Sequence, residues 1–105
     1  MERSAILVIT TTSSAGDARA IAAHLLEKKL AACVQILPVE SHFVWQEKIQ
    51  SEKEFALHIK APAAKFEDLR QAVCDIHTYE VPEIICLNIQ DAHQPYLDWL
   101  HEVTE

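Results

Sequence analysis

The sequence predicts an α+β fold of the ferredoxin-like kind, a split βαβ sandwich of two helices on an antiparallel sheet. Three observations carry this prediction. Residues 5–11 are a β-branched, apolar run typical of a strand. Residues 54–60 alternate apolar and polar side chains, as a half-buried strand does, and residues 66–76 repeat apolar residues every three or four positions, as an amphipathic helix does. The element order, β-α-β-β-α-β, is that of the split βαβ arrangement.

A helix follows the first strand. Ser13 and Ser14 are suited to cap it, because a serine hydroxyl accepts a hydrogen bond from the free N–H groups of a first helical turn. One stripe of the predicted helix is formed by Ala18, Ile21, Ala22, Leu25 and Lys29.

The next segment predicts a second strand and a hairpin. Residues 32–37 form the strand, and we expect Pro38 to end it. Residues 43–49 extend it toward a hairpin turn, which we place around residues 50–53. The third strand, residues 54–60, then brings the chain back.

The second half of the chain repeats the pattern. Pro62 stops the third strand, and the amphipathic helix over residues 66–76 follows. Residues 83–89 are predicted as the fourth strand. Pro95 favours the start of a short C-terminal helix, because its fixed φ suits a first helical turn.

Both faces of the predicted sheet are apolar, although both crossover helices should cover the same face. In the first and last strands, one set of alternate residues is as hydrophobic as the other. We therefore expect a second copy of the chain to cover the open face, so that the protein is a homo-oligomer. In the first strand, one face holds Ile6 and Val8 and the other holds Ala5, Leu7 and Ile9. In the last strand, one face holds Ile85, Leu87 and Ile89 and the other holds Ile84 and Cys86.

Composition narrows the possible partners. The chain has 105 residues, which suits a single domain over residues 1–105, and a formal net charge of −7. Its nine Lys and Arg residues form no stripe, so we expect no binding to nucleic acid or to anionic membranes. No segment is long and apolar enough for a signal peptide or a membrane span. A single glycine, Gly16, excludes a P-loop.

Three widely spaced cysteines, Cys33, Cys74 and Cys86, argue against a disulfide framework and a structural zinc site. Reduced thiols fit a cytoplasmic protein. Cys33 and His77 can be written as a nucleophile and base pair, but Cys33 lies in an apolar run, where a free cysteine is usually a buried small hydrophobe. We therefore expect the protein not to be an enzyme.

The segment 77–84 holds the richest mixture of functional side chains. His77, Glu80 and Glu83 could bind a metal, but their spacing matches no established ligand motif. The alternative interpretation is that His77 satisfies a helix C-terminus and that the two carboxylates are solvated or reach another subunit. The aromatic residues near element ends, Trp45, Tyr79, Tyr96 and Trp99, favour packing in a core or interface.

Taken in order, several motifs resemble the CutA family of divalent-cation tolerance proteins. They cover nearly the whole chain, and the ordered set is more specific than any one piece. The motifs are Thr10-Thr11-Thr12, Ile21-Ala22, Lys29-Leu30-Ala31-Ala32-Cys33-Val34, Ile36-Leu37-Pro38, Trp45-Gln46-Glu47-Lys48-Ile49, Lys60, His77-Thr78-Tyr79-Glu80-Val81-Pro82-Glu83-Ile84 and Tyr96-Leu97-Asp98-Trp99-Leu100.

The resemblance implies a ferredoxin-like subunit in a PII-like homotrimer and a role in tolerance of divalent metals, copper especially. It implies no obligatory cofactor. Copper ligands proposed in the family are a cysteine near the end of the first strand and a histidine pair, and here these positions hold Thr10 and Ile76-His77. Glu47 and Thr78 also depart from the glycine and proline usual in the family.

These considerations give one hypothesis and two alternatives. The hypothesis is a cytoplasmic, homotrimeric, CutA-like protein that binds metal weakly through His77, with Cys33 and Glu80 as secondary ligands. The residues expected at subunit contacts or in packing are Trp45, Tyr79, Glu83 and Trp99. The first alternative is a PII-like sensor that binds a small molecule between subunits. The second alternative is an acylphosphatase-like hydrolase, which would need an arginine in an anion-binding loop. It is the weakest of the three, because the arginines of this chain lie at a terminus and on predicted helices.

Overall fold

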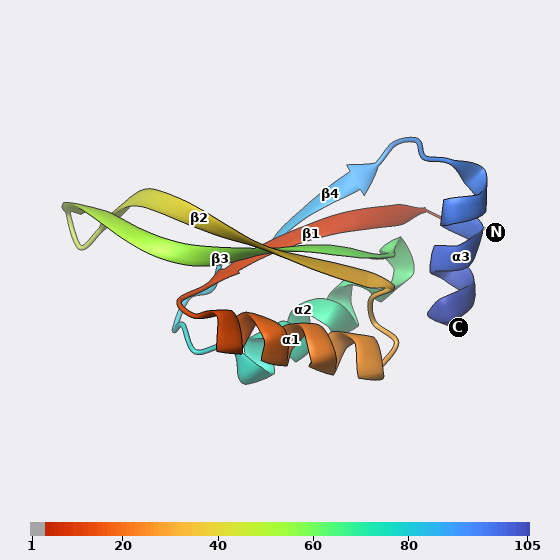
Figure 1. Ribbon diagram of the computed structural model, residues 1–105, viewed down its shortest axis with the longest axis horizontal. Coiled ribbons are helices and arrows are strands. Elements are labelled where there is room, and N and C mark those ends of the chain that lie inside the picture. Colours follow the sequence, from red (N-terminus) through yellow and green to blue (C-terminus); the bar gives the residue numbers. More distant parts are fainter. Residues whose placement is uncertain (1–3) are drawn as a thin grey trace.

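The computed structural model describes residues 4–105 and confirms the predicted order of elements (Figure 1). The strands are β1 Ala5–Thr12, β2 Cys33–Trp45, β3 Lys48–Pro62 and β4 Ile85–Ile89. The helices are α1 Ala15–Glu27, α2 Phe66–Ile76 and α3 Gln94–Val103, with a short 3-10 turn, η1 Ala63–Lys65, before α2.

The four strands form one antiparallel sheet in the order β2-β3-β1-β4, so the predicted α+β, ferredoxin-like class is confirmed. Helices α1 and α2 lie side by side across one face of the sheet (Figure 1). Helix α3 lies beyond one end of the sheet, and the β2–β3 hairpin projects as an arm from the other end. The molecule is consequently elongated, with extents of 46 × 25 × 21 Å.

The register of the strands places the core between the sheet and helices α1 and α2. Val8 of β1 pairs with Ile59 of β3, and both are fully buried. Alternate residues of each strand therefore point toward the helices, as the two-residue period of a strand requires. The buried apolar cluster is formed by Ile6, Val8, Ala18, Ile21, Leu25, Ala31, Leu57, Ile59, Ala61, Leu69, Ala72 and Val73.

Helix α1 begins and ends at residues with clear local causes. Ser14 is its N-cap, and the Ser14 hydroxyl accepts a hydrogen bond from the Asp17 N–H at 3.0 Å. Lys29, which was predicted to continue the helical stripe, lies beyond the end of the helix with a left-handed φ of 58°. The Leu30 N–H donates back to the Leu25 carbonyl at 2.9 Å. This is the Schellman arrangement, which terminates the helix without leaving its last carbonyls unpaired.

Two predicted boundaries are wrong in β2 and β3. Pro38 does not end β2, because β2 is an edge strand and a proline there, opposite Phe55, need not donate to the ladder. The hairpin turn lies at Gln46 and Glu47 rather than at residues 50–53, since both residues have left-handed φ angles, of 50° and 65°. The two strands are therefore much longer than predicted.

The fourth strand also begins later than predicted, at Ile85 rather than residue 83. Residues 77–84 cross from the end of α2 to β4 as a loop. Helix α3 starts as predicted, with Pro95 in its first turn. It is anchored by Leu100, which is fully buried, and the Lys60 ammonium lies 5.8 Å from the Tyr96 ring centroid.

Glu47 gives a testable prediction about this turn. Glu47→Gly should raise the free energy of unfolding by about 1 kcal/mol, because glycine adopts a positive φ without the steric cost that a side chain incurs. Chemical denaturation at a fixed chain concentration measures the change. Ser51→Gly in the neighbouring strand is the control and should lower stability, since its backbone is extended. A Glu47→Gly variant no more stable than the parent would contradict this account.

The face of the sheet opposite α1 and α2 remains largely open and apolar. Leu7 pairs with Leu87, and Ile9 pairs with Ile85. Leu87 is 44% exposed, Ile85 is 47% exposed and Leu37 of β2 is 38% exposed. The predicted surplus apolar face is therefore present in the single chain. Among residues 4–105, no helix has the length and apolar character needed to cross a membrane.

Candidate functional site

The loop between α2 and β4 is held against the sheet by His77. The His77 backbone N–H donates to the Val73 carbonyl at 2.9 Å and ends α2. The imidazole turns away from the helix toward β1, so it does not serve the helix C-terminus as the alternative interpretation supposed. Its Nε2 lies 2.9 Å from the Thr11 carbonyl oxygen and 3.4 Å from the Thr10 hydroxyl.

These contacts assign the histidine tautomer. The His77 Nδ1 accepts a hydrogen bond from the Tyr79 backbone N–H at 3.0 Å, so Nδ1 carries no proton. Nε2 must then carry the proton that it donates to the Thr11 carbonyl. Both ring nitrogens are thus engaged within the chain, and the ring links β1 to the start of the loop. In this arrangement neither nitrogen has a lone pair free for a metal ion.

Tyr79 extends the same loop toward β3. Its ring lies beside the His77 ring, with 4.9 Å between centroids, and its hydroxyl donates to the Glu54 carboxylate. Glu54 is only 7% exposed, and Tyr79 is its hydrogen-bond donor. Burial, followed by the hydrogen bond to Glu54 and the negative charges of Glu54, Glu52 and Asp17, raises the pKa of Tyr79 above its usual value.

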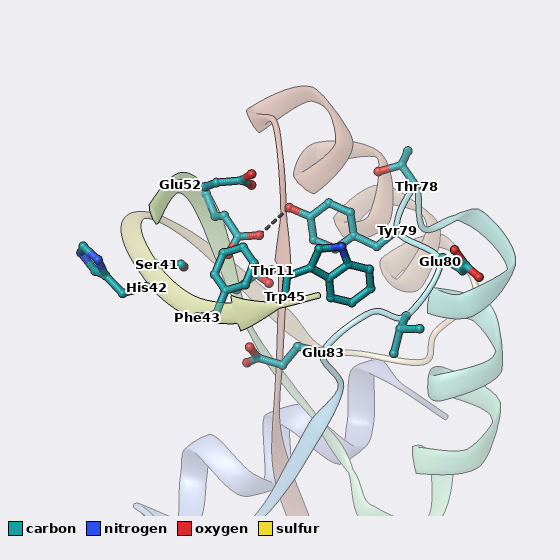
Figure 2. Close-up of a pocket in the computed structure, with 12 residues that line it drawn as sticks. Thr11, Ser41, His42, Phe43, Trp45, Glu52, Thr78, Tyr79, Glu80 and Glu83 are labelled. Carbon is teal, nitrogen blue, oxygen red and sulfur yellow. Dashed lines mark hydrogen bonds between the residues drawn. The ribbon is translucent and has the colours of Figure 1, made fainter. Parts of the chain in front are cut away.

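A pocket of about 650 Å³ opens where this loop meets the β2–β3 arm. Among residues 4–105, those that line it include one phenylalanine, one tryptophan, one tyrosine and four glutamates, and no lysine or arginine. Figure 2 shows the Trp45 and Tyr79 rings in the wall of this pocket, with the labelled carboxylates Glu52, Glu80 and Glu83 on different sides of them. The lining residues are Thr11, Ser41, His42, Phe43, Trp45, Glu52, Glu54, Thr78, Tyr79, Glu80, Val81 and Glu83.

The pocket brings together three of the four residues predicted for subunit contacts or packing, together with Glu80, a predicted metal ligand. Trp45, Tyr79, Glu80 and Glu83 all line it, although Trp45 comes from the end of β2 and the others from the loop. Trp99 lies elsewhere, on α3, where its ring is 5.5 Å from the Tyr96 ring. Whether any of them touches another subunit stays a prediction.

The three predicted metal ligands do not come together within one chain. Glu80 lines the pocket, and His77 lies behind it against β1. Cys33 is paired with Lys60 of β3, whereas Thr11, which His77 contacts, is paired with Ala56 of β3. Lys60 and Ala56 are four residues apart, which separates the two positions by about 13 Å along an extended strand. Over residues 4–105 no group of three or more His, Cys, Asp and Glu side chains is arranged to hold a metal ion. The residues of a single chain therefore do not fit a metal centre.

Sequence reasoning missed Glu52, Glu54 and Phe43 as pocket residues. A signal for Glu54 was present, because alternation in β3 sends Phe55 toward the helices and Glu54 toward the open face. Its partner Tyr79 is 25 positions away in the sequence, and no local pattern connects the two.

The comparison with protein families decides which family the chain belongs to. The family model described as CutA1 divalent ion tolerance protein matches residues 6–103. The chain belongs to the CutA family. The resemblance inferred from the ordered motifs is therefore confirmed.

Relatives of this CutA chain come from distant organisms. The divalent-cation tolerance protein CutA of Archaeoglobus fulgidus is 41% identical over 98 residues, which are 93% of this chain and 96% of that protein. The chloroplastic CutA of Arabidopsis thaliana is 38% identical over 94% of this chain and 55% of its own length. The solved structure of the Archaeoglobus fulgidus protein, described as periplasmic, superposes with a TM-score of 0.94 and covers 96% of this chain and 99% of that one.

Membership in the CutA family places this chain among divalent-cation tolerance proteins. These relatives give no support to the alternative of a PII-like sensor. All three cysteines are free thiols, with Cys74 and Cys86 exposed and Cys33 half-buried rather than buried as expected. The CutA chain therefore presents an open apolar sheet face and, at its edge, an acidic pocket with an aromatic lining.

Proposed function

We propose that this protein acts in divalent-cation tolerance as a cytoplasmic homotrimer without enzymatic activity, and that it binds metal ions weakly and transiently at the acidic pocket. The observation that carries the proposal is the composition of the pocket wall, in which the described lining residues include four glutamates and one histidine, His42, but no lysine or arginine. Such a wall attracts cations without fixing them in one geometry.

The homotrimer is supported by the open face of the sheet. Leu7, Ile9, Ile85 and Leu87 form a continuous apolar surface on paired strands, and the last two are nearly half exposed in the single chain. A soluble protein gains free energy when a second copy covers such a surface. β2 and β4 are edge strands, which a neighbouring copy can also extend.

Weak binding is supported by the positions of the predicted ligands. His77 uses both ring nitrogens to hold the loop, and Cys33 lies at the other end of the sheet. Glu80, which is exposed at the pocket rim, is then the predicted ligand best placed to meet a cation. Metal contact of this kind relies on oxygen ligands and exchanges with water readily.

Three free cysteines support a cytoplasmic location, because thiols stay reduced there. The chloroplastic description of the Arabidopsis thaliana relative and the periplasmic description of the Archaeoglobus fulgidus structure apply to those proteins. A binding role rather than an enzymatic one is supported by His77, whose two ring nitrogens are both hydrogen-bonded and which lies far from Cys33, so the pair of nucleophile and base considered from the sequence does not form within the chain.

The test is calorimetric titration of the freshly reduced, desalted protein with Cu²⁺ and Zn²⁺, together with native mass spectrometry of the assembly. We expect three chains per particle and weak metal binding that Glu80→Gln lowers by about fivefold, the worth of one exposed carboxylate. Glu27→Gln on α1, an exposed glutamate outside the pocket, is the matched control. Metal binding that Cys33→Ser removes and Glu80→Gln leaves unchanged would overturn the pocket assignment.

A further inference from the structure

The carboxylates of the pocket are distributed rather than convergent. Glu52 and Glu54 come from β3, whereas Glu80 and Glu83 come from the loop before β4. In Figure 2 the labelled carboxylates lie around the Trp45 and Tyr79 rings and do not point at one centre. Tight coordination of a divalent metal ion needs several oxygen atoms within about 2.0–2.6 Å of one point, and the described residues of this wall are not arranged for it, so a metal ion would bind here only weakly.

The aromatic side chains of the wall favour a positively charged nitrogen attached to an apolar group. Phe43, Trp45 and Tyr79 bring three rings to the cavity, and Val81 adds an apolar side chain. Phe43 is 37% exposed and Trp45 is 49% exposed, which leaves ring surface available to a ligand. Ring faces attract a positively charged nitrogen, most strongly those of tryptophan.

Size and charge point to the same class of ligand. A volume of about 650 Å³ lies within the range of small-molecule sites and far exceeds what a bare metal ion occupies. With four glutamates and no lysine or arginine in the wall, a cation is favoured over a neutral or anionic molecule of the same shape. Because Glu54 is already bonded to Tyr79, the glutamates left to meet a ligand are Glu52, Glu80 and Glu83.

We propose that this pocket binds a small organic cation, a positively charged nitrogen on an apolar body, with the nitrogen beside Glu52 or Glu83 and the apolar body against Trp45 and Phe43. The proposal shares with the proposed function only the attraction of a cation to this pocket. It differs in the ligand, which the aromatic rings hold as much as the carboxylates do. An organic cation and a metal ion would therefore compete for the same glutamates of this pocket.

The experiment compares three probes of nearly the same shape with the assembled wild-type protein by calorimetry at low salt: benzylamine, benzyl alcohol and benzoate. We expect benzylamine to bind at least about fivefold more tightly than benzyl alcohol, and benzoate to give no binding, because the three probes share a phenyl ring and differ chiefly in the charge of the attached group. Binding should weaken with added salt, since the carboxylates are exposed. Equal binding of the amine and the alcohol, or none by the amine, would overturn the proposal.

Variants locate the site. Either Glu83→Gln or Glu52→Gln, according to which carboxylate meets the nitrogen, should weaken benzylamine binding by about fivefold, and Trp45→Leu by about three- to fivefold, whereas Glu27→Gln should leave it unchanged. Native mass spectrometry of each variant shows whether the assembly is kept. Weakening by Glu27→Gln equal to that by Glu83→Gln would mean that the protein's overall charge, not the pocket, attracts the amine.

The outcomes separate the two proposals. Benzylamine binding that persists when no metal binding is detected supports the organic ligand and removes the metal role. Metal binding without benzylamine binding removes the organic ligand and leaves the proposed function standing. If benzylamine binds only a dissociated form of the protein, a second copy of the chain occupies the pocket in the assembly, and the proposal of a free ligand is wrong.

Discussion

Leu87→Asp is expected to convert the proposed homotrimer into monomers. Leu87 lies on edge strand β4 beside Leu7, on the face that α1 and α2 leave uncovered, and it is 44% exposed in the single chain. In an assembly that covers this face, the substitution removes about 2 kcal/mol of apolar burial and leaves a carboxylate without a partner, at about 1–3 kcal/mol more. The sum weakens each subunit contact by roughly a thousandfold.

Sedimentation equilibrium over a range of chain concentrations measures this effect. Leu26→Asp is a closely matched control, because Leu26 is the same residue type, is 43% exposed and lies on α1 instead of the open face. The control should remain assembled. An unchanged particle mass for Leu87→Asp, or equal dissociation of both variants, would show that the open face is not the subunit contact.

Tyr79→Phe is expected to lower the free energy of unfolding by about 2 kcal/mol. The substitution keeps the ring but removes the hydroxyl that donates to Glu54, a carboxylate only 7% exposed. A buried acceptor that loses its donor incurs most of its desolvation penalty. Chemical denaturation of both proteins at the same chain concentration gives the difference, since the stability of an oligomer depends on concentration.

Two controls isolate the hydrogen bond. Tyr96→Phe removes a hydroxyl from α3, away from Glu54, and should change stability by no more than about 0.5 kcal/mol. Glu54→Gln combined with Tyr79→Phe should cost less than the sum of the single changes, because the two side chains are coupled. Additive effects would mean that the hydroxyl contributes nothing to the position of Glu54.

The same pair predicts a dependence on alkaline pH. The pKa of Tyr79 is raised above its ordinary value of 10.0 in the folded protein, mainly by burial and by Glu54. Above about pH 10 the unfolded chain releases the Tyr79 proton while the folded chain retains it, so the stability that Tyr79 contributes falls as the pH rises. The stability difference between the wild type and Tyr79→Phe should therefore shrink above pH 10. A constant difference up to pH 11 would contradict the raised pKa.

Much of the fold could be predicted because local periods determine it. The spacing of apolar residues located α2 at its observed bounds, Phe66–Ile76, and the serine cap located the start of α1. The alternation in β1 and β4 also predicted the open apolar face, which the exposed Leu87 and Ile85 confirm. These features depend on residues within a few positions of one another, which a sequence displays directly.

The sequence indicated some residues of the candidate site but not their roles. His77, Tyr79, Glu80 and Glu83 attracted attention as a mixed segment between two regular elements, but their roles depend on partners far along the chain. The His77 imidazole meets the Thr11 carbonyl across 66 positions, and this contact makes it a residue that holds the loop. The sequence could not show that the Thr11 backbone carbonyl would occupy the His77 ring nitrogen, because every residue has a carbonyl and no sequence pattern marks which one a side chain meets.

The sequence by itself determined the element order, the bounds of α2, the serine cap of α1, the surplus apolar face and the family, since each depends on local spacing or on motifs in order. The tertiary structure alone decided the length of the β2–β3 arm. Pro38 does not interrupt β2 because β2 is an edge strand, and the turn lies at Gln46 and Glu47, whose φ angles are left-handed. It also decided the pocket, because the chain closes that space only when the loop after α2 packs on β3 and Tyr79 meets Glu54. Contacts of this range arise from how the elements pack, and packing depends on the whole chain at once.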